Sequence, residues 1–569
     1  MSAPSPVYTT ENACQDCYKC IRHCPCRAIR IDNGHAGVIV ELCVACGMCV
    51  RVCPAKAKKI RSDLLRVKYL LNSGKKVYAS LAPSFISYFK QYDRGALAAA
   101  LIQAGFAGVS ETALGAQIVS AETAVFLDKA KPGVYLSSAC PAVVDYVRKY
   151  VPYYVANIVP VFSPILAHAK LLRKHYGQDI GVVFFGPCAA KKNEADQHPE
   201  LLDLAVTFSD LVGLLAGEDV KLGSVETGHY AAMSPNDAEE GKVYAVEGGM
   251  NDTLRRAKND IRYISVSGLH NLERLFRDIP DPQMLHDCKI FAECLACSGG
   301  CINGPAMSGS GAGTLAAIAQ IVKEYKGGSS IGRQAEILIE SQFLPDVRTE
   351  RNVTENDIKT ALVSVGKFVA ADELNCGGCG YSTCREFAKA LLTNKAETEM
   401  CVSYLRQLAQ RKSNALIRYI PAGVVIVDRN LKVLECNKHF AELFDEDILT
   451  AFETCGLVGA EIRLFVEFSD LIASILNGGG ALQRHHLVCS NQILNVSIFT
   501  ISAHQSVGVI VQNVTNIELH REQVSEKARA VIQKNIVTCQ QIARSLGEHM
   551  AETEILLREI AGTYSAVKE

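Results

Sequence analysis

The 569-residue chain has no tryptophan and a net charge of only −1, with 59 Lys and Arg residues against 60 Asp and Glu. This balance excludes the strong overall attraction to nucleic acid or to anionic membranes that a basic protein has. Residues 1–13 have neither the basic segment and apolar run of a secretory signal nor a twin-Arg pair. We therefore expect a cytoplasmic protein whose cysteines stay out of disulfides.

Long apolar helices are also missing from the sequence pattern. Two long uncharged stretches, residues 150–169 and 294–322, contain three prolines and six glycines respectively. Such residues suit loops and short helices, so we expect no membrane span. The hydrophobic content of 49% is typical of a folded chain, and the length predicts several domains.

Cysteine is the residue in excess, with 23 copies. The spacing Cys-x2-Cys-x2-Cys-x3-Cys-Pro runs from Cys14 to Pro25 and again from Cys43 to Pro54. In bacterial two-cluster ferredoxins this spacing binds two cubanes, and each fourth cysteine ligates the other cluster. The predicted [4Fe-4S] ligand sets are Cys14, Cys17, Cys20 and Cys53, and Cys43, Cys46, Cys49 and Cys24. A zinc module of CxxC pairs is the alternative, which the doubled spacing disfavours. Cys26 is then a spare, structural cysteine.

Residues 76–365 alternate between short β-rich runs, such as KVYASLAP and DIGVVFFGPC, and helical runs, such as GALAAALIQAGF and SPILAHAKLLRKHY. This alternation predicts parallel sheets, whose strands end in functional loops. Three cysteine motifs fall in such loops, at residues 137–141 (SSACP), 186–194 (GPCAAKKNE) and 293–301 (ECLACSGGC). Each motif alone is weak, because a buried cysteine is most often an inert apolar residue. The ordered set is more specific and offers four thiolates for one further cluster: Cys140, Cys188, Cys297 and Cys301.

The three motifs resemble the signature loops of [FeFe]-hydrogenases, in the same order. The resemblance implies that the four cysteines hold the [4Fe-4S] part of an H-cluster and that Cys301 bridges to its diiron subsite, which carries CO, cyanide and dithiolate ligands. It also implies that Lys191 hydrogen-bonds a cyanide of that subsite. Glu194 matches a glutamate of the second motif, which we interpret as structural support.

Three departures from the hydrogenase pattern change the surroundings of the diiron site. Ala139 stands where catalytic relatives have the cysteine that relays protons, and alanine cannot exchange a proton. Gly186 and Leu295 stand where those relatives place methionine. Because no cluster ligand is lost, we expect the cofactor to bind and turnover to be slow. Glu122 and Glu293 are acidic candidates for another proton route, although both also fit structural roles.

A further cysteine group follows at residues 376–401, with the spacing Cys-x2-Cys-x4-Cys-x16-Cys. Its CGGCGYSTC segment resembles small four-cysteine Fe–S domains of corrinoid and electron-transfer proteins. We predict a third accessory [4Fe-4S] cluster, with a helix from Arg385 to about Met400 returning the last ligand; zinc is the alternative. The predicted ligands are Cys376, Cys379, Cys384 and Cys401.

The last 150 residues carry no clustered cysteines. The order of elements after residue 420 resembles a PAS domain: the segment IPAGVVIVD (residues 420–428), a strand at 431–437, helical AELFDE and two later strands ending at 508–514. Within it we interpret Cys436, Cys455 and Cys489 as packing residues. Beyond it, apolar residues recur at spacings of four and three from Ile532 to Ile560. This seam predicts a parallel dimer; a helix packed on its own PAS domain is the alternative.

The arrangement resembles the sensory, PAS-containing [FeFe]-hydrogenases. We expect a multidomain α/β chain: a ferredoxin-like α+β module (1–72), a two-lobed H-cluster domain (73–365), a four-cysteine domain (366–410), an α+β PAS domain (411–517) and a C-terminal coiled-coil helix (518–569). The expected function is slow, reversible H2 oxidation and proton reduction, coupled through three accessory clusters to a signalling output. The expected partners are H2, protons, ferredoxin or a similar carrier, and a separate kinase or phosphatase. A metabolic ferredoxin-dependent hydrogenase and an Fe–S assembly scaffold without a diiron site are the alternatives.

Overall fold

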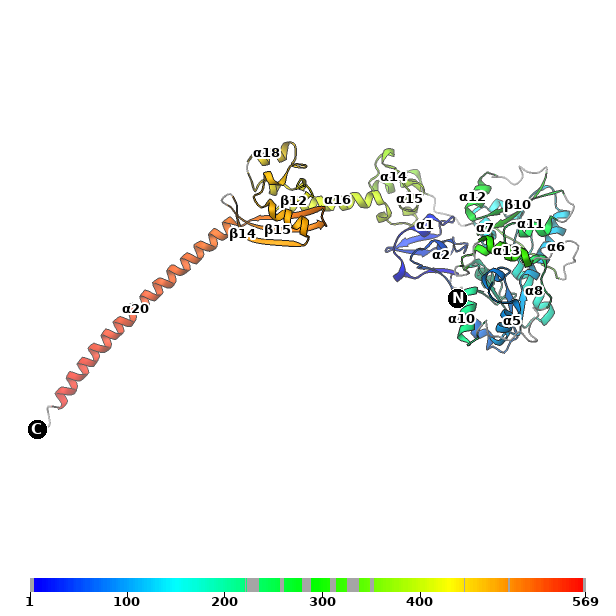
Figure 1. Cartoon of the computed structure of the whole chain (residues 1–569), viewed down its shortest axis with the longest axis horizontal. Helices are drawn as coiled ribbons and strands as arrows, with labels where there is room; N and C mark the ends of the chain where they lie inside the picture. Colours follow the sequence, from blue (N-terminus) through cyan, green and yellow to red (C-terminus); the bar gives the residue numbers. More distant parts are fainter. Residues whose placement is uncertain are drawn as a thin grey trace. The chain divides into compact units, whose positions relative to one another are not determined.

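The computed structural model divides the chain into two compact units, Met1–Tyr404 and Leu405–Glu569. Figure 1 labels many of their elements. The structure describes residues 5–220, 222, 235–255, 260–278, 288–307, 314–324, 337–347, 353–444, 446–489 and 492–565. None of the helices in these residues is long and apolar enough to cross a bilayer.

The first 60 residues form a small module with an internal repeat. Strand β1 pairs antiparallel with β4, and β2 pairs antiparallel with β3. Equivalent positions of the two halves take the same left-handed backbone, as at Arg27 (φ 47°) and Lys56 (φ 51°), each three residues after a Cys-Pro cysteine. The doubled sequence pattern is therefore also a doubled fold. Its elements are β1 (Val7–Thr9), α1 (Lys19–Arg22), β2 (Ile29–Asp32), β3 (His35–Val38), α2 (Met48–Val52) and β4 (Lys58–Ile60).

Two parallel sheets make up the next region, as the alternating pattern predicts. One has the strand order β6-β5-β8-β9 and the other β10-β11-β7. Every residue of β5 and β8 is buried, because helices cover both faces of that sheet. The strands are β5 (Val77–Leu81), β6 (Gly108–Glu111), β7 (Gly133–Leu136), β8 (Gly181–Gly186), β9 (Leu204–Thr207), β10 (Ile261–Ser267) and β11 (Lys289–Leu295). The longer helices are α5 (Arg94–Gln103), α6 (Ala113–Lys129), α7 (Pro141–Tyr150), α8 (Pro164–Tyr176), α9 (Ala190–Gln197), α10 (Phe208–Gly217), α12 (Leu269–Asp278) and α13 (Thr314–Glu324).

The four-cysteine segment contains α14 (Glu355–Ser364) and α15 (Cys384–Leu392). The prediction that a helix runs to about Met400 is wrong. Helix α15 stops where Asn394 adopts a left-handed backbone (φ 54°), and a 3-10 turn, Thr398–Met400, leads to Cys401. One apolar core joins this segment to the ferredoxin-like module, with Ile21 and Phe387 among its buried side chains.

The second unit contains a five-stranded antiparallel sheet in the order β13-β12-β16-β15-β14. Asn437 organises its entry: the side chain donates to the carbonyl oxygens of Ile417 (2.9 Å) and Ala422 (2.8 Å) and accepts the Val424 N–H (2.8 Å). Two details of the prediction are wrong: three strands, and not two, follow the helices, and within AELFDE (441–446) residues 442–444 are not helical. Asp445 of this segment lies outside the described residues. The elements are α16 (Val402–Tyr419), whose first three residues belong to the first unit, β12 (Gly423–Asp428), β13 (Val433–Cys436), α17 (Lys438–Ala441), α18 (Glu446–Thr454), α19 (Ser469–Gly478), β14 (Ala481–Cys489), β15 (Gln492–Ser502) and β16 (Ser506–Asn513).

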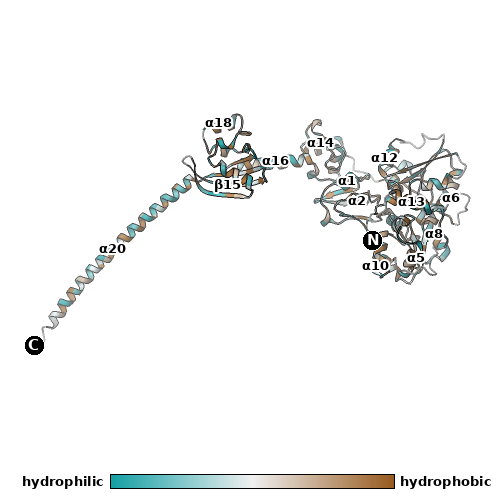
Figure 2. Cartoon of the chain, in the orientation of Figure 1, coloured by the Kyte–Doolittle hydropathy of each residue, from teal (hydrophilic) through white to brown (hydrophobic). Residues whose placement is uncertain are grey.

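The chain continues as one long helix, α20 (Thr515–Ser565). Figure 2 shows apolar and polar residues alternating along it. The apolar seam is exposed to solvent, with Ile536, Leu546 and Leu557 at 46%, 58% and 60% exposure. No described part of the chain thus packs over these seam residues, and the pairing of the seam in a dimer stays a prediction.

Candidate functional site

The loops after β7, β8 and β11 meet around a cavity of about 90 Å³. Cys140 caps α7, Cys188 lies between β8 and α9, and Cys301 begins a 3-10 turn; all three lie on the cavity wall. Gly299 and Gly300 precede Cys301 with φ values of 77° and 98°, a backbone that other residues rarely adopt. The carboxyl ends of parallel strands thus gather the predicted cysteines, as the sequence implied.

The thiols of this cavity influence one another electrostatically. Cys297 does not line the cavity, but it interacts with Cys140, Cys188 and Cys301. Burial raises the pKa of the Cys188 thiol to about 11 and that of Cys301 to about 12. Without a bound cation the thiols of Cys188, Cys297 and Cys301 are therefore neutral at pH 7, and positive metal ions favour their thiolates.

Lys191 is fixed on the same wall. Its Nζ donates to Glu194 Oε2 at 2.7 Å and to Ser163 Oγ at 2.9 Å. Its charge lowers the pKa of the neighbouring Cys188 and Cys301 thiols against the larger effect of burial. Glu194 therefore holds the ammonium in place, which agrees with the supporting role expected for it.

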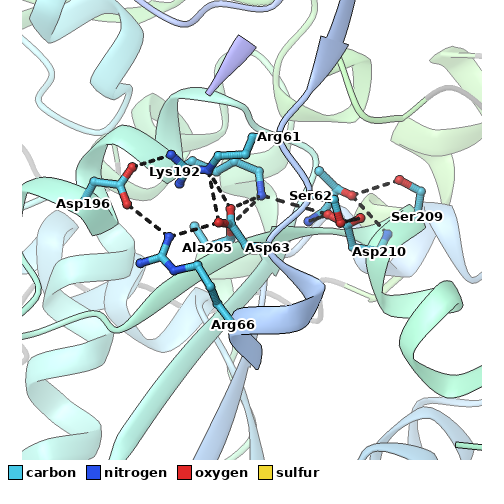
Figure 3. Close-up of polar contacts among 10 residues, drawn as sticks. Arg61, Ser62, Asp63, Arg66, Lys192, Asp196, Ala205, Ser209 and Asp210 are labelled. Carbon is cyan, nitrogen blue, oxygen red and sulfur yellow. Dashed lines mark hydrogen bonds and ion pairs between the residues drawn. The ribbon is translucent and has the colours of Figure 1, made fainter. Parts of the chain in front are cut away.

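The helix that carries Lys191 is anchored by a buried ionic network, drawn in Figure 3. The Lys192 side chain is fully buried, and its Nζ donates to Asp63 Oδ2 and to the Ala205 carbonyl, both at 2.9 Å. Arg61 and Arg66 also pair with Asp63, at 3.1 and 3.0 Å. These ion pairs lower the pKa of Asp63 against the opposing effect of its burial, which is the largest single influence. The network ties α9 to the segment that follows the ferredoxin-like module.

The remaining wall of the cavity is apolar except at a few points. Glu293 is 2% exposed and accepts the Met250 N–H at 3.2 Å; burial raises its pKa to about 7. Tyr244 also lines the cavity and shares a 2.6 Å hydrogen bond with Ser120 Oγ. Glu122 lies on α6 and is not part of the wall. Of the two acidic candidates, only Glu293 therefore reaches the cavity.

Ser84 is a wall residue that the sequence analysis missed. Its side chain is fully buried, and its hydroxyl has no hydrogen-bond partner in the described structure. An unpaired buried hydroxyl in an apolar pocket suits a bound polar group that accepts its proton. Together with the thiols and Lys191, this orphaned donor makes the cavity fit an anionic, ligand-bearing metal cluster. Ser84 follows β5, so the strand-end rule that singled out the cysteine motifs would have found it.

The structure shows how the three departures lie in the cavity. Ala139 and Leu295 line the wall. Gly186 has no room for a side chain, because a Cβ there would lie 2.4 Å from the Phe184 ring. The Phe184 ring lines the cavity instead, so the space near residue 186 is filled from two residues upstream on the same strand.

In the ferredoxin-like module, several of the predicted cysteine ligands interact electrostatically. Cys24, although it follows the first motif, interacts electrostatically with Cys43, Cys46 and Cys49 of the second. Cys20 interacts with Cys14 and Cys17. For Cys53 the structure records a bond from the Ala57 N–H to Sγ at 3.3 Å, and its approach to the first motif stays a prediction. Cys26 is 5% exposed and packs in the core, which suits a structural residue.

The third group is only partly brought together. Cys379 interacts electrostatically with Cys376 and Cys401. Cys384 is buried at the start of α15, where its N–H donates to Asn375 Oδ1 at 2.8 Å, and its place with the other three remains a prediction. Among the described residues, no three His, Cys, Asp or Glu side chains converge as one metal ion would require. A cubane lies between its ligands and holds them farther apart than one zinc ion does.

Contacts join the module to the cavity and to the third group. Cys46 interacts electrostatically with Cys297, and a Cβ on the adjacent Gly47 would lie 2.5 Å from Pro305. On the other side, Arg27 donates to the Gly380 carbonyl at 2.9 Å and lies over the Tyr381 ring. The three cysteine groups and the cavity therefore form one contiguous series.

Four family models match the chain. Residues 75–305 match the C-terminal domain of the iron-only hydrogenase large subunit, 6–54 a 4Fe-4S dicluster domain, 372–403 an Fe-S cluster domain and 411–481 a PAS domain. Iron hydrogenase 1 of Clostridium pasteurianum is 26% identical over 300 residues, which are 43% of this chain and 52% of that protein. The chain thus spans about half the length of this curated relative.

Two kinds of solved structure are similar to parts of the chain. An [FeFe]-hydrogenase of Chlamydomonas reinhardtii is 16% identical, with a TM-score of 0.39, over 51% of this chain and 100% of that one. The PAS domain of the histidine kinase ThkA is 8% identical, with a TM-score of 0.13, over 16% of this chain and 97% of that one.

The matched domains and the gathered cysteines define an iron–sulfur protein. More particularly, the chain is a hydrogenase-like protein that carries a PAS domain.

Proposed function

We propose that the chain is a sensory [FeFe]-hydrogenase of low activity, whose H-cluster site reports H2 or redox state to the PAS domain and α20. The observation that carries this proposal is the cavity in which Cys140, Cys188 and Cys301 meet Lys191 and the unpaired Ser84 hydroxyl. When bound, a diiron subsite supplies the heterolytic chemistry of H2. The proposal places the protein in the cytoplasm, where metal-binding thiols stay reduced.

In this proposal the chain's own residues hold the group and handle protons. Lys191, locked by Glu194 and Ser163, presents a fixed ammonium to an anionic ligand. Glu293 has a pKa of about 7, because it is buried, and it therefore exchanges a proton near neutral pH. Ala139 contributes neither donor nor acceptor, which makes proton supply at that point slow.

Electrons would pass between the cavity and the cysteine groups of the first unit. The electrostatic interaction between Cys46 and Cys297 supports a step from the cavity to the nearer ferredoxin-type cluster. The packing of Arg27 on Gly380 and Tyr381 supports a further step toward the third cluster. Helix α16 begins at Val402, directly after the predicted ligand Cys401, and leads into the PAS domain.

Infrared spectroscopy of the maturated chain tests the proposal. Bands of CO and cyanide ligands, together with about eighteen iron atoms per chain from four cubanes and a diiron unit, are the expected result. A Lys191→Ala variant should lose the bands but keep the iron of the accessory clusters. Native protein with full cubane content and no such bands would favour the assembly scaffold. Turnover equal to that of a metabolic hydrogenase would favour the ferredoxin-dependent enzyme.

A further inference from the structure

Lys58, at the start of β4, is a buried cation that has no carboxylate partner among the described residues. Its residue is 3% exposed, and its Nζ donates to the Thr9 hydroxyl and to the Ala36 carbonyl oxygen, both at 2.6 Å. Both acceptors are neutral, and the described residues hold no carboxylate within ion-pair distance of this ammonium. A buried ammonium is costly unless an anion compensates its charge.

The internal repeat shows that the fold itself does not require a lysine here. Lys58 lies five residues after Cys53, and the equivalent position, five residues after Cys24, is Ile29. Ile29 begins β2, is 2% exposed and packs in an apolar core. One half of the module thus fills this buried strand position with an apolar side chain, and the other half fills it with a charge.

Lys58 interacts electrostatically with cysteines of both predicted ligand sets. Its charge favours the thiolate of Cys20, which belongs to the first predicted ligand set. It also favours the thiolates of Cys24, Cys43 and Cys49, which belong to the second. No other lysine or arginine influences ligands of both sets in this way among the described cysteines whose pKa is shifted.

We propose that Lys58 is a built-in counter-ion shared by the two [4Fe-4S] clusters of the ferredoxin-like module and that it raises the reduction potential of both. The inference rests on the cluster binding proposed above, and not on H2 turnover. One-electron reduction adds a negative charge to a cluster that is already anionic with its four thiolates, so a fixed cation favours the reduced form. At an effective dielectric constant of about 20 and a separation of about 10 Å, one charge changes such an equilibrium roughly 10-fold. A 10-fold change corresponds to about 59 mV for a one-electron couple.

The test is an EPR-monitored redox titration of the full chain, reconstituted with cubanes but without a diiron subsite. Lys58→Gln removes the charge and keeps donors for Thr9 and Ala36, whereas Lys58→Arg keeps the charge. Lys59→Gln, at the exposed neighbouring position, is the matched control. We expect Lys58→Gln to lower the potentials of two clusters, with the reduced fraction of each falling roughly 10-fold at a fixed potential. Lys58→Arg and Lys59→Gln should titrate as the native chain does.

Unchanged potentials in Lys58→Gln, or an equal shift in Lys59→Gln, overturn the inference. If Lys58→Gln fails to hold clusters, Lys58→Ile, which repeats the Ile29 side chain of the other half, is compared with Lys58→Arg. Cluster loss in both neutral variants but not in Lys58→Arg supports the counter-ion, and loss in all three indicates a packing role and refutes it. A native chain that binds no cubanes in this module contradicts the proposed function itself. Failure of the proposed function is therefore distinguishable from failure of the counter-ion inference, in which the cubanes bind but their potentials do not depend on Lys58.

Discussion

Replacing Ala139 with cysteine restores a thiol at the wall of the cavity and should speed proton transfer. The residue lines the cavity of about 90 Å³ together with Glu293, whose pKa of about 7 leaves it partly protonated at neutral pH. A positioned proton relay typically contributes ~10²–10⁴ in rate, or about 2.7–5.4 kcal/mol of barrier. Leu295 and the Phe184 ring stay in place, so we expect a gain near ~10².

The assay is H2 production with a chemical reductant, normalised to the infrared intensity of the diiron ligands. Two matched variants isolate the relay. Ala245→Cys puts the same thiol elsewhere on the wall, and Ala139→Ser adds a hydroxyl that is a poor acid. Neither should gain more than a few-fold. Because the pKa of Glu293 is raised, its protonated fraction falls as pH rises through about 7, and production should fall with it. Equal rates in Ala139→Cys and in the native chain, at equal diiron loading, would refute the role given to this alanine.

Three further predictions concern packing and assembly. Lys192→Met leaves Asp63 with its arginine partners and should lower the free energy of unfolding by about 3 kcal/mol in denaturant titrations. Because the pKa of Asp63 is lowered, the stability that the Asp63 carboxylate contributes is present above about pH 4 and is lost as pH falls further. The difference in stability between Lys192→Met and the native chain should therefore shrink below about pH 4. Gly186→Met should destabilise the chain because its side chain clashes with the Phe184 ring, and adding Phe184→Ala should reduce that destabilisation in a double-mutant cycle. Stability changes of the two substitutions that simply add would contradict this packing. Changing Leu546 and Leu557 to Asp should convert a dimer to a monomer, as measured by light scattering, and should abolish H2-dependent regulation of a partner kinase or phosphatase. The coupling free energy lost would be ~1–3 kcal/mol. A native chain that is already monomeric would contradict the signalling role of the seam.

The parts of the site that the sequence predicted are those set by local spacing. Cysteines two, three or four residues apart share a loop wherever the loop lies, and strand-end loops of parallel sheets meet at one edge. The assignment of Cys24 to the second motif follows the same rule and stays a prediction, which its electrostatic interaction with Cys46 and Cys49 supports. Glu293, which the sequence offered only as a candidate, needed the structure to show that it reaches the cavity.

The parts that the sequence did not predict depend on side-chain and backbone conformations that residue type alone does not fix. Nothing local to residues 184–186 shows that the Phe184 ring fills the space beside Gly186. The burial of Lys58 depends on strands β1 and β3, which come from elsewhere in the module. The predicted helix to about Met400 failed because a left-handed residue, Asn394, ends α15 where helix propensity alone does not.

Exposure of the fully loaded chain to H2 tests the central claim most directly. Under H2, and not under argon, the accessory [4Fe-4S] clusters should become reduced and give their EPR signals, slowly in the native chain and faster in Ala139→Cys. The Lys191→Ala variant, which keeps the accessory clusters, should stay oxidised under both gases. Accessory clusters that remain oxidised under H2 in a native chain carrying CO and cyanide bands would contradict the account.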